Sequence, residues 1–236
     1  MTETHERLVG RLAAVLAGVQ GMEPVPQRLC EAGRQMLGAD GVAITLSTAK
    51  GSRETVGATD ALSTHLEDLQ DVVGQGPSVD ALSTRMVEIA SLRADDDQRW
   101  PLMQQHGAGL DFAGTMIAVP LVAGDDVIGV LTAHRQGGAT DDDRDIGLVL
   151  GPALGTALLH DPQLGLDGHG YADEWPSRAQ VHQATGMVVG QVGVLPEDAL
   201  ALLKGQAFAQ GSTLTEVARQ VVERRIDLRR FTIETD

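Results

Sequence analysis

Cysteine, aromatic and basic residues are all scarce in this chain of 236 residues. Cys30 is the only cysteine, so one chain can form neither an internal disulfide nor a cysteine-based zinc site. After residue 177 only Phe208 and Phe231 are aromatic, which limits stacking on nucleobases. The formal net charge of −15 means that the surface as a whole would repel a nucleic-acid backbone.

Long apolar runs and metal-binding spacings are missing as well. No stretch approaches the roughly 18 apolar residues of a membrane span, and the polar start MTETHERLVG differs from a leader peptide. We therefore expect a cytoplasmic protein without membrane contact. The seven histidines include no His-x-x-x-His pair, and the carboxylates at 95–97 and 141–145 follow one another too closely to converge. We predict no metal site, no cofactor and no enzymatic activity.

The charge is distributed unevenly. Residues 1–177 hold 11 Lys and Arg against 26 Asp and Glu, a net charge of −15, whereas residues 178–233 hold 7 against 5, a net charge of +2. Only the C-terminal part can approach a polyanion without opposition. Its basic residues either contact phosphates or form a solvated polar face. They are Arg178, Lys204, Arg219, Arg224, Arg225, Arg229 and Arg230.

Hydrophobic spacing in the N-terminal part predicts helices around an antiparallel sheet. Leucines and valines at helical spacing predict a helix from His5 to about Gln20, and a second helix follows Pro26 and ends at Gly38. A hairpin is predicted across Gly124-Asp125-Asp126. This order favours an α+β domain over a doubly wound parallel sheet. The strands are expected at 41–48, 52–58, 85–90, 114–122 and 126–135.

The C-terminal part is predicted to be a bundle of three helices. A helix from Thr140 to about His160, which Pro152 should kink or restart, precedes a Gly-, Pro- and Asp-rich linker at 161–177. The second bundle helix begins at Pro196, and the third opens with a capping box at 213–216.

Two glycines in the first bundle helix need an explanation. Gly186 and Gly190 lie inside the predicted helix, where glycine costs about 1 kcal/mol relative to alanine. Close approach of another surface would account for them. That surface is either the neighbouring helix of the bundle or a ligand, and the sequence leaves both open.

Residues 178–225 resemble the ANTAR domain, a three-helix module of bacterial transcription antitermination regulators. The resemblance rests on Arg178, Gln183-Ala184-x-Gly186-Met187, Glu197-x-Ala199, Leu203, Ala207 and Leu214-x-x-Val217-Ala218. It implies binding of paired RNA stem-loops that compete with a terminator hairpin, usually by a homodimer. Thr185 departs from the lysine of many members, which removes one phosphate contact. The implied RNA-binding residues are Arg178, Gln183, Ala184, Thr185, Gly186, Lys204 and Arg219.

Residues 24–160 resemble a GAF domain, a sensory antiparallel-sheet module that commonly precedes ANTAR in actinobacterial regulators. The matching pieces are GADGVAITL, LQDVVGQGPSVDAL, RWPLM and AVPLVAGDDVIGVLTAHR. Related chains often have cysteine where Ser78 stands, so thiol chemistry is excluded at that position. The resemblance implies a pocket for a small-molecule ligand. We expect Trp100, Met103 and His106 beside it.

These observations predict an RNA-binding antitermination regulator with a sensory domain. Its parts would be an N-terminal helix at 1–23 that contributes to a dimer stalk, a GAF-like domain at 24–160, a linker at 161–177 and an ANTAR-like domain at 178–236. Two other functions remain open. In the first, the bundle binds a protein partner instead of RNA. In the second, the protein binds a small-molecule ligand, and its C-terminal output domain has lost its function.

Overall fold

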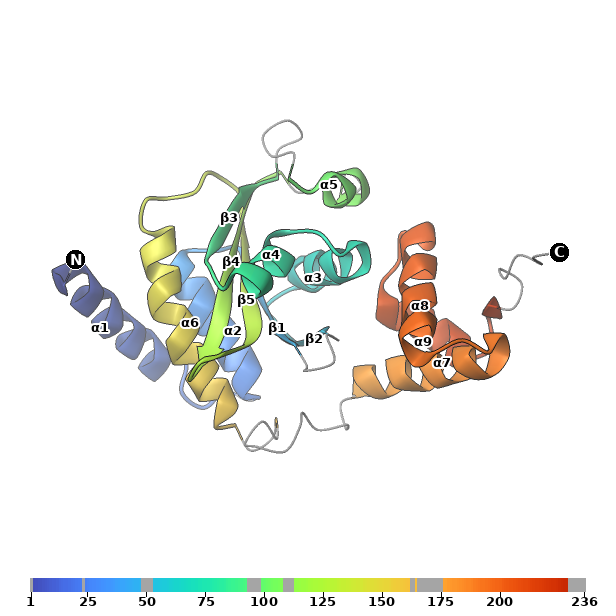
Figure 1. Cartoon of the computed structure of the whole chain (residues 1–236). Coiled ribbons are helices and arrows are strands. Elements are labelled where there is room, and N and C mark those ends of the chain that lie inside the picture. Colours follow the sequence, from blue (N-terminus) through green and yellow to red (C-terminus); the bar gives the residue numbers. More distant parts are fainter. Residues whose placement is uncertain are drawn as a thin grey trace. The chain divides into compact units, whose positions relative to one another are not determined.

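The chain divides into two compact units, Met1–Tyr171 and Ala172–Asp236 (Figure 1). The computed structural model describes residues 2–22, 24–47, 53–92, 99–107, 113–161, 164 and 176–228. Most of the predicted linker at 161–177 lies outside these residues. None of the helices in the described ranges is both long and apolar enough to cross a membrane.

The first unit is built on a five-stranded antiparallel sheet with strand order β2-β1-β5-β4-β3. The predicted hairpin is confirmed, because β4 and β5 pair directly and Gly124 between them has φ 62°. The predicted antiparallel sheet is confirmed as well. The strands are β1 Gly41–Ser47, β2 Arg53–Ala58, β3 Glu88–Ser91, β4 Thr115–Ala123 and β5 Asp126–Arg135.

Helices cover both faces of this sheet (Figure 1). On one face, α2 (Val25–Leu37) places Gly33 against Leu131 of β5, and α6 (Asp143–Leu159) packs on β4. On the other face lie α3 (Ala61–Val73), α4 (Pro77–Thr84) and α5 (Pro101–Gly107), where Val130 of β5 packs with Ala81. The N-terminal helix α1 (Thr2–Gly18) packs on α2 and α6.

Helix α6 approaches β4 more closely than a side chain would allow. A Cβ at Gly151 would lie 2.5 Å from the carbonyl oxygen of Pro120, and one at Gly155 would overlap the backbone of Val122. Of the two effects predicted for Pro152, a restart of the helix is wrong, because α6 is a single helix that contains Pro152. Pro152 is exposed, so the turn that lacks its N–H hydrogen bond faces solvent instead of the sheet.

A buried polar network ties α3 and α4 to β2. Arg53 donates from Nη2 to Glu67 Oε2 at 3.0 Å and to Ser78 Oγ at 2.6 Å. Gln70 donates to Glu67 Oε1 at 2.9 Å and accepts from the backbone N–H of Ser78 at 2.8 Å. The side chains of Arg53 and Glu67 are only 9% and 2% exposed, so each charge depends on the other.

The second unit is a bundle of three helices, as predicted. These are α7 (Pro176–Val192), α8 (Pro196–Gln210) and α9 (Leu214–Val222). Thr213 caps α9 by accepting the N–H of Glu216 at 3.1 Å, which confirms the predicted helix start. The core residues are mostly small, which brings the helices close together. They are Ala184, Val188, Ala199, Leu203, Ala207, Val217, Ala218 and Val221 on the three helices, and Leu228 after them.

Cys30 is expected to be chemically inert in the folded protein. Its side chain has no exposed surface, and burial raises the pKa of the thiol to about 12. Almost no thiolate is then present at pH 8. We expect iodoacetamide to modify Cys30 in urea but not in the native protein, as followed by mass spectrometry. Modification of the native protein at the rate of a free thiol would show that the thiol is accessible.

Replacing Arg53 with methionine should destabilise the first unit strongly. R53M leaves Glu67 charged and buried, which costs about 3–5 kcal/mol of unfolding free energy. The double variant R53M/E67Q removes the unpaired charge and should recover part of this loss. Urea denaturation measures both.

R34M is the matched control for this measurement. Arg34 pairs with Glu31 within one helix, and its side chain is 38% exposed. Loss of such a surface pair should cost less than about 1 kcal/mol. An R53M variant no less stable than R34M would contradict the importance of the buried pair.

Candidate functional site

One face of α7 exposes backbone instead of side chains. Gln183, Gly186 and Gly190 share this face by their spacing, and all three are exposed. We call these three residues the glycine face. A Cβ at Gly186 or Gly190 would meet no atom within 4 Å, so close packing of a neighbouring helix does not explain these glycines. Of the two explanations that the sequence left open, the neighbouring helix is wrong for the described residues.

The two residues between Gln183 and Gly186 are less exposed than the glycine face. Ala184 has no exposed surface, so it cannot contact RNA directly, contrary to the expectation from the resemblance. Its methyl group lies in the bundle core because the core stripe of α7 passes through this position. Thr185 is half-buried, and its hydroxyl donates to the carbonyl oxygen of Val181 at 2.7 Å. The hydroxyl proton is thus used inside the helix, and the oxygen keeps only its acceptor capacity.

The basic residues that were predicted to bind RNA lie on three different helices. Arg178 belongs to α7, but its side chain is outside the described part, and Lys204 is half-buried on α8. Arg219 on α9 donates to Glu216 at 2.6 Å and to Glu223 at 3.0 Å. Hydrogen bonds from Arg219 lower the pKa of Glu216 to about 2, and these carboxylates raise the pKa of Arg219. The charge of Arg219 is therefore compensated locally.

A pocket beside the glycine face was not predicted from the sequence. Met187 and Gln191 of α7, with Arg224, Ile226 and Asp227, line a volume of about 330 Å³. The chain turns back to α7 after α9, where the N–H of Leu228 donates to Gln191 Oε1 at 3.4 Å. The helical repeat of apolar residues does not continue past residue 222. The sequence pattern therefore could not show that the chain turns back to α7.

The turn after α9 places an arginine in a left-handed conformation. Arg224 has φ 59°. The N–H groups of Arg224 and Arg225 donate to the carbonyl oxygens of Val221 and Gln220 at 3.0 and 2.8 Å, which is the pattern of a Schellman motif. Glycine is the usual residue at this position because it has no Cβ to clash.

The residues expected beside a ligand pocket in the first unit belong largely to its core. Trp100 and Met103 are 3% and 2% exposed and pack in a cluster with Leu66 and Met116. The indole N–H of Trp100 donates to Asp80 Oδ2 at 2.9 Å. His106 is half-buried at the end of α5. Trp100 directly precedes α5, whereas Met103 and His106 lie in it, and Trp100 and Met103 pack against residues of α3 and the sheet.

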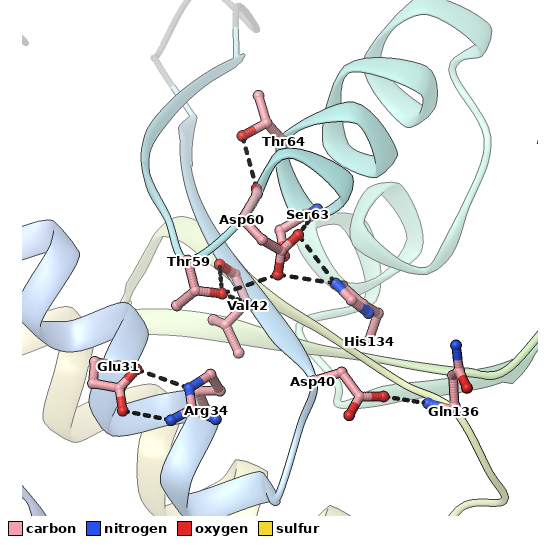
Figure 2. A network of polar contacts seen from close by, with 10 residues as sticks. All are labelled: Glu31, Arg34, Asp40, Val42, Thr59, Asp60, Ser63, Thr64, His134 and Gln136. Carbon is pink, nitrogen blue, oxygen red and sulfur yellow. Dashed lines mark hydrogen bonds and ion pairs between the residues drawn. The ribbon is translucent and has the colours of Figure 1, made fainter. Parts of the chain in front are cut away.

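A polar cluster around Asp60 joins α3 to the sheet (Figure 2). Asp60 accepts from the N–H of Ser63 at 2.7 Å and lies 3.3 Å from Nε2 of His134. Burial alone would raise the pKa of Asp60, but the Ser63 N–H and His134 outweigh it and lower that pKa. A Cβ at Gly41 would overlap Asp60 and His134, so only glycine fits beneath them.

This cluster has the composition of a catalytic triad but not its geometry. Ser63 and His134 both contact Asp60, and Asp60 lies between them (Figure 2). A nucleophilic serine needs the histidine as its direct base. Within the described ranges no group of three or more His, Cys, Asp and Glu residues is placed to hold a metal ion. The cluster therefore lacks the serine–histidine contact of a catalytic triad, and it connects α3 to β5 through Asp60.

The chain matches two domain families. Residues 22–159 match the GAF domain, and residues 173–222 match the ANTAR domain. No curated protein matches the chain.

Several solved structures are similar to this chain. The GAF domain of a phosphoenolpyruvate-protein phosphotransferase from Acinetobacter is 11% identical, covers 67% of this chain and 97% of that chain, and has a TM-score of 0.49. The GAF domain of a phosphoenolpyruvate-protein phosphotransferase from Coxiella burnetii is 12% identical, with coverages of 68% and 98% and a TM-score of 0.49. The second GAF domain of DevS from Mycobacterium smegmatis is 20% identical, with coverages of 56% and 89% and a TM-score of 0.41.

The GAF match spans more than half of the chain and contains the whole five-stranded sheet. The ANTAR match spans α7, α8 and α9. GAF domains are sensory, and ANTAR domains are the RNA-binding type found in transcription antitermination, so both are regulatory and not catalytic domain types. The chain belongs to the GAF domain family and carries an ANTAR domain at its C-terminal side.

Proposed function

We propose that this protein is an RNA-binding transcription antitermination regulator of the actinobacterial type. The ANTAR domain binds a paired stem-loop in a nascent transcript and prevents formation of the terminator hairpin. Nascent transcripts place this activity in the cytoplasm. The observation that carries the proposal is the exposed glycine face of α7, which lies inside the ANTAR match.

The glycine face suits RNA because it lets a bulky ligand approach the helix backbone. Two interior glycines cost the isolated helix about 1 kcal/mol each, and among the described residues no atom lies close enough to require glycine at either position. Gln183 adds an amide that can both donate and accept hydrogen bonds at the same face. Arg178, Thr185, Gly186 and Lys204 complete the proposed surface. Arg219 contributes less, because Glu216 and Glu223 already compensate its charge.

The GAF domain would control RNA binding in two ways, by binding a small-molecule ligand and by forming a dimer. A small molecule binds the GAF domain near Trp100, Met103 and His106. Two copies associate through α1 and α6, on which Val9 is 46% and Leu148 is 60% exposed. Residues 1–23 and 24–160 then form the regulatory part, residues 161–177 the linker, and residues 178–236 the RNA-binding part.

A protein partner is the second candidate for the bundle. Leu195, which precedes α8 as its N-cap residue, is 61% exposed, and Leu202 within α8 is 42% exposed. The two leucines are seven residues apart. Exposed leucines at this spacing favour an apolar contact over a phosphate backbone. Such an interface would depend little on salt, whereas RNA binding depends on it steeply.

The affinity for RNA should depend on the salt concentration and on the basic side chains of α7 and α8. Titration of the full chain with a paired RNA hairpin carrying a six-nucleotide loop should give an affinity that falls steeply between about 50 and 200 mM salt. R178A/K204A should weaken binding and reduce the salt slope by about two. Fluorescence anisotropy measures both quantities.

R219A is the control for these substitutions. Because Glu216 and Glu223 compensate its charge, R219A should reduce the salt slope by less than the one unit expected for a cation that contacts a phosphate. Binding that is independent of salt would favour the protein-partner function. No binding of the hairpin in the presence or absence of a GAF ligand would contradict the proposal.

A further inference from the structure

We propose that the first unit binds a flat heteroaromatic ligand with an N–H donor in the place that the indole of Trp100 fills. This inference rests on the proposed sensory function of the GAF domain and names the chemical class of its ligand. The sequence predicted Trp100 beside a ligand pocket, yet its ring is only 3% exposed and lies in the core. Both observations agree if the chain's own indole occupies the ligand site.

Apolar side chains surround this ring and suit another flat ring of similar size. Leu66 of α3, Ala90 of β3, Met103 of α5 and Met116 of β4 are buried in one cluster with Trp100. We call the place enclosed by these four residues the indole site. Methionine adapts its shape easily and contacts aromatic rings favourably. A swap of one ring for another of equal volume therefore leaves the sheet in place.

A carboxylate gives the indole site its one polar requirement. The indole N–H donates to Asp80 Oδ2 at 2.9 Å, and Asp80 is half-buried. Among the described residues, this carboxylate has no other hydrogen-bond partner. A ligand that displaces the indole must offer a new donor, because a carboxylate removed from water without one is costly. The site therefore selects a ring with an N–H group over a ring without one.

Side-chain contacts hold Trp100 in the site, and none of them is a hydrogen bond of the sheet. The guanidinium of Arg99 lies over the indole, 4.1 Å from its centroid, and is 46% exposed. The N–H of Leu102 donates to Gln75 Oε1 at 3.0 Å. One turn later, the buried Nε2 of Gln104 has no acceptor among the described residues. Because Trp100 directly precedes α5, its displacement changes the start of that helix and provides a signal.

The test uses the ¹⁵N-labelled full chain, indole as the probe, and benzofuran as the matched ring without an N–H. Trp100 and Trp175 are the two tryptophans of the chain, so the variant W175F leaves the indole N–H signal of Trp100 alone in the NMR spectrum. Saturating indole should shift this signal to the position of an exposed tryptophan. Indole should also bind at least about ten-fold more tightly than benzofuran, because only indole replaces the hydrogen bond to Asp80.

Two variants and a control connect this binding to the indole site. D80A should bind indole and benzofuran with equal affinity, because it lacks the acceptor. W100L removes the ring that competes with the ligand, so it should bind indole at least about ten-fold more tightly than the unchanged chain. D125A is the matched control, since Asp125 is an exposed carboxylate in the turn between β4 and β5. It should leave both affinities unchanged.

The outcomes distinguish this inference from the proposed function. No binding of indole up to its solubility limit, or binding that leaves the Trp100 signal in place, would overturn the inference. A preference for indole that D80A retains would overturn it too, because another group would then accept the N–H. RNA binding is measured separately with the hairpin. Displacement of Trp100 by indole in a protein that binds no hairpin would contradict RNA binding and leave the indole site intact.

Discussion

The close approach of α6 to β4 is the constraint on which the sensor unit depends. Gly147, Gly151 and Gly155 recur at every fourth position of α6, and each would clash with β4 or its surroundings if it carried a Cβ. The helix can therefore lie directly on the backbone of the strand, and its apolar residues reach the core. The same requirement applies on the opposite face, where Gly41 makes room for Asp60 and His134.

Helix α7 has the same spacing of glycines but not the same neighbours. Gly186 and Gly190 are four residues apart like the glycines of α6, yet they face open space. The contrast indicates that the partner of α7 lies outside its own unit. Under the proposed function that partner is RNA, because α7 lies inside a match to a domain type that binds RNA.

Local patterns in the sequence predicted most of the fold. The turn at Gly124 and the cap at Thr213 act over a few residues, and both were found where expected. The strand predicted at 85–90 begins only at Glu88, because Arg85 still caps α4. The site was harder to predict because it depends on contacts between distant residues. Arg219 lies three and four positions from Glu216 and Glu223, a spacing at which opposite charges pair on a helix, so the sequence already contained this signal. The return of the chain to Gln191 follows from no such spacing. The Arg53–Glu67 pair joins elements that no periodicity connects.

The central claim is that the glycine face exists for RNA, and alanine substitution tests it most directly. G186A/G190A should raise the unfolding free energy of the bundle by up to about 2 kcal/mol, because alanine favours the helix and meets no neighbour. The account predicts that the same variant binds the RNA hairpin at least ten-fold more weakly. G205A on α8, where a Cβ also meets nothing, should stabilise the bundle without affecting RNA binding. A stabilised G186A/G190A variant with unchanged RNA affinity would contradict the claim.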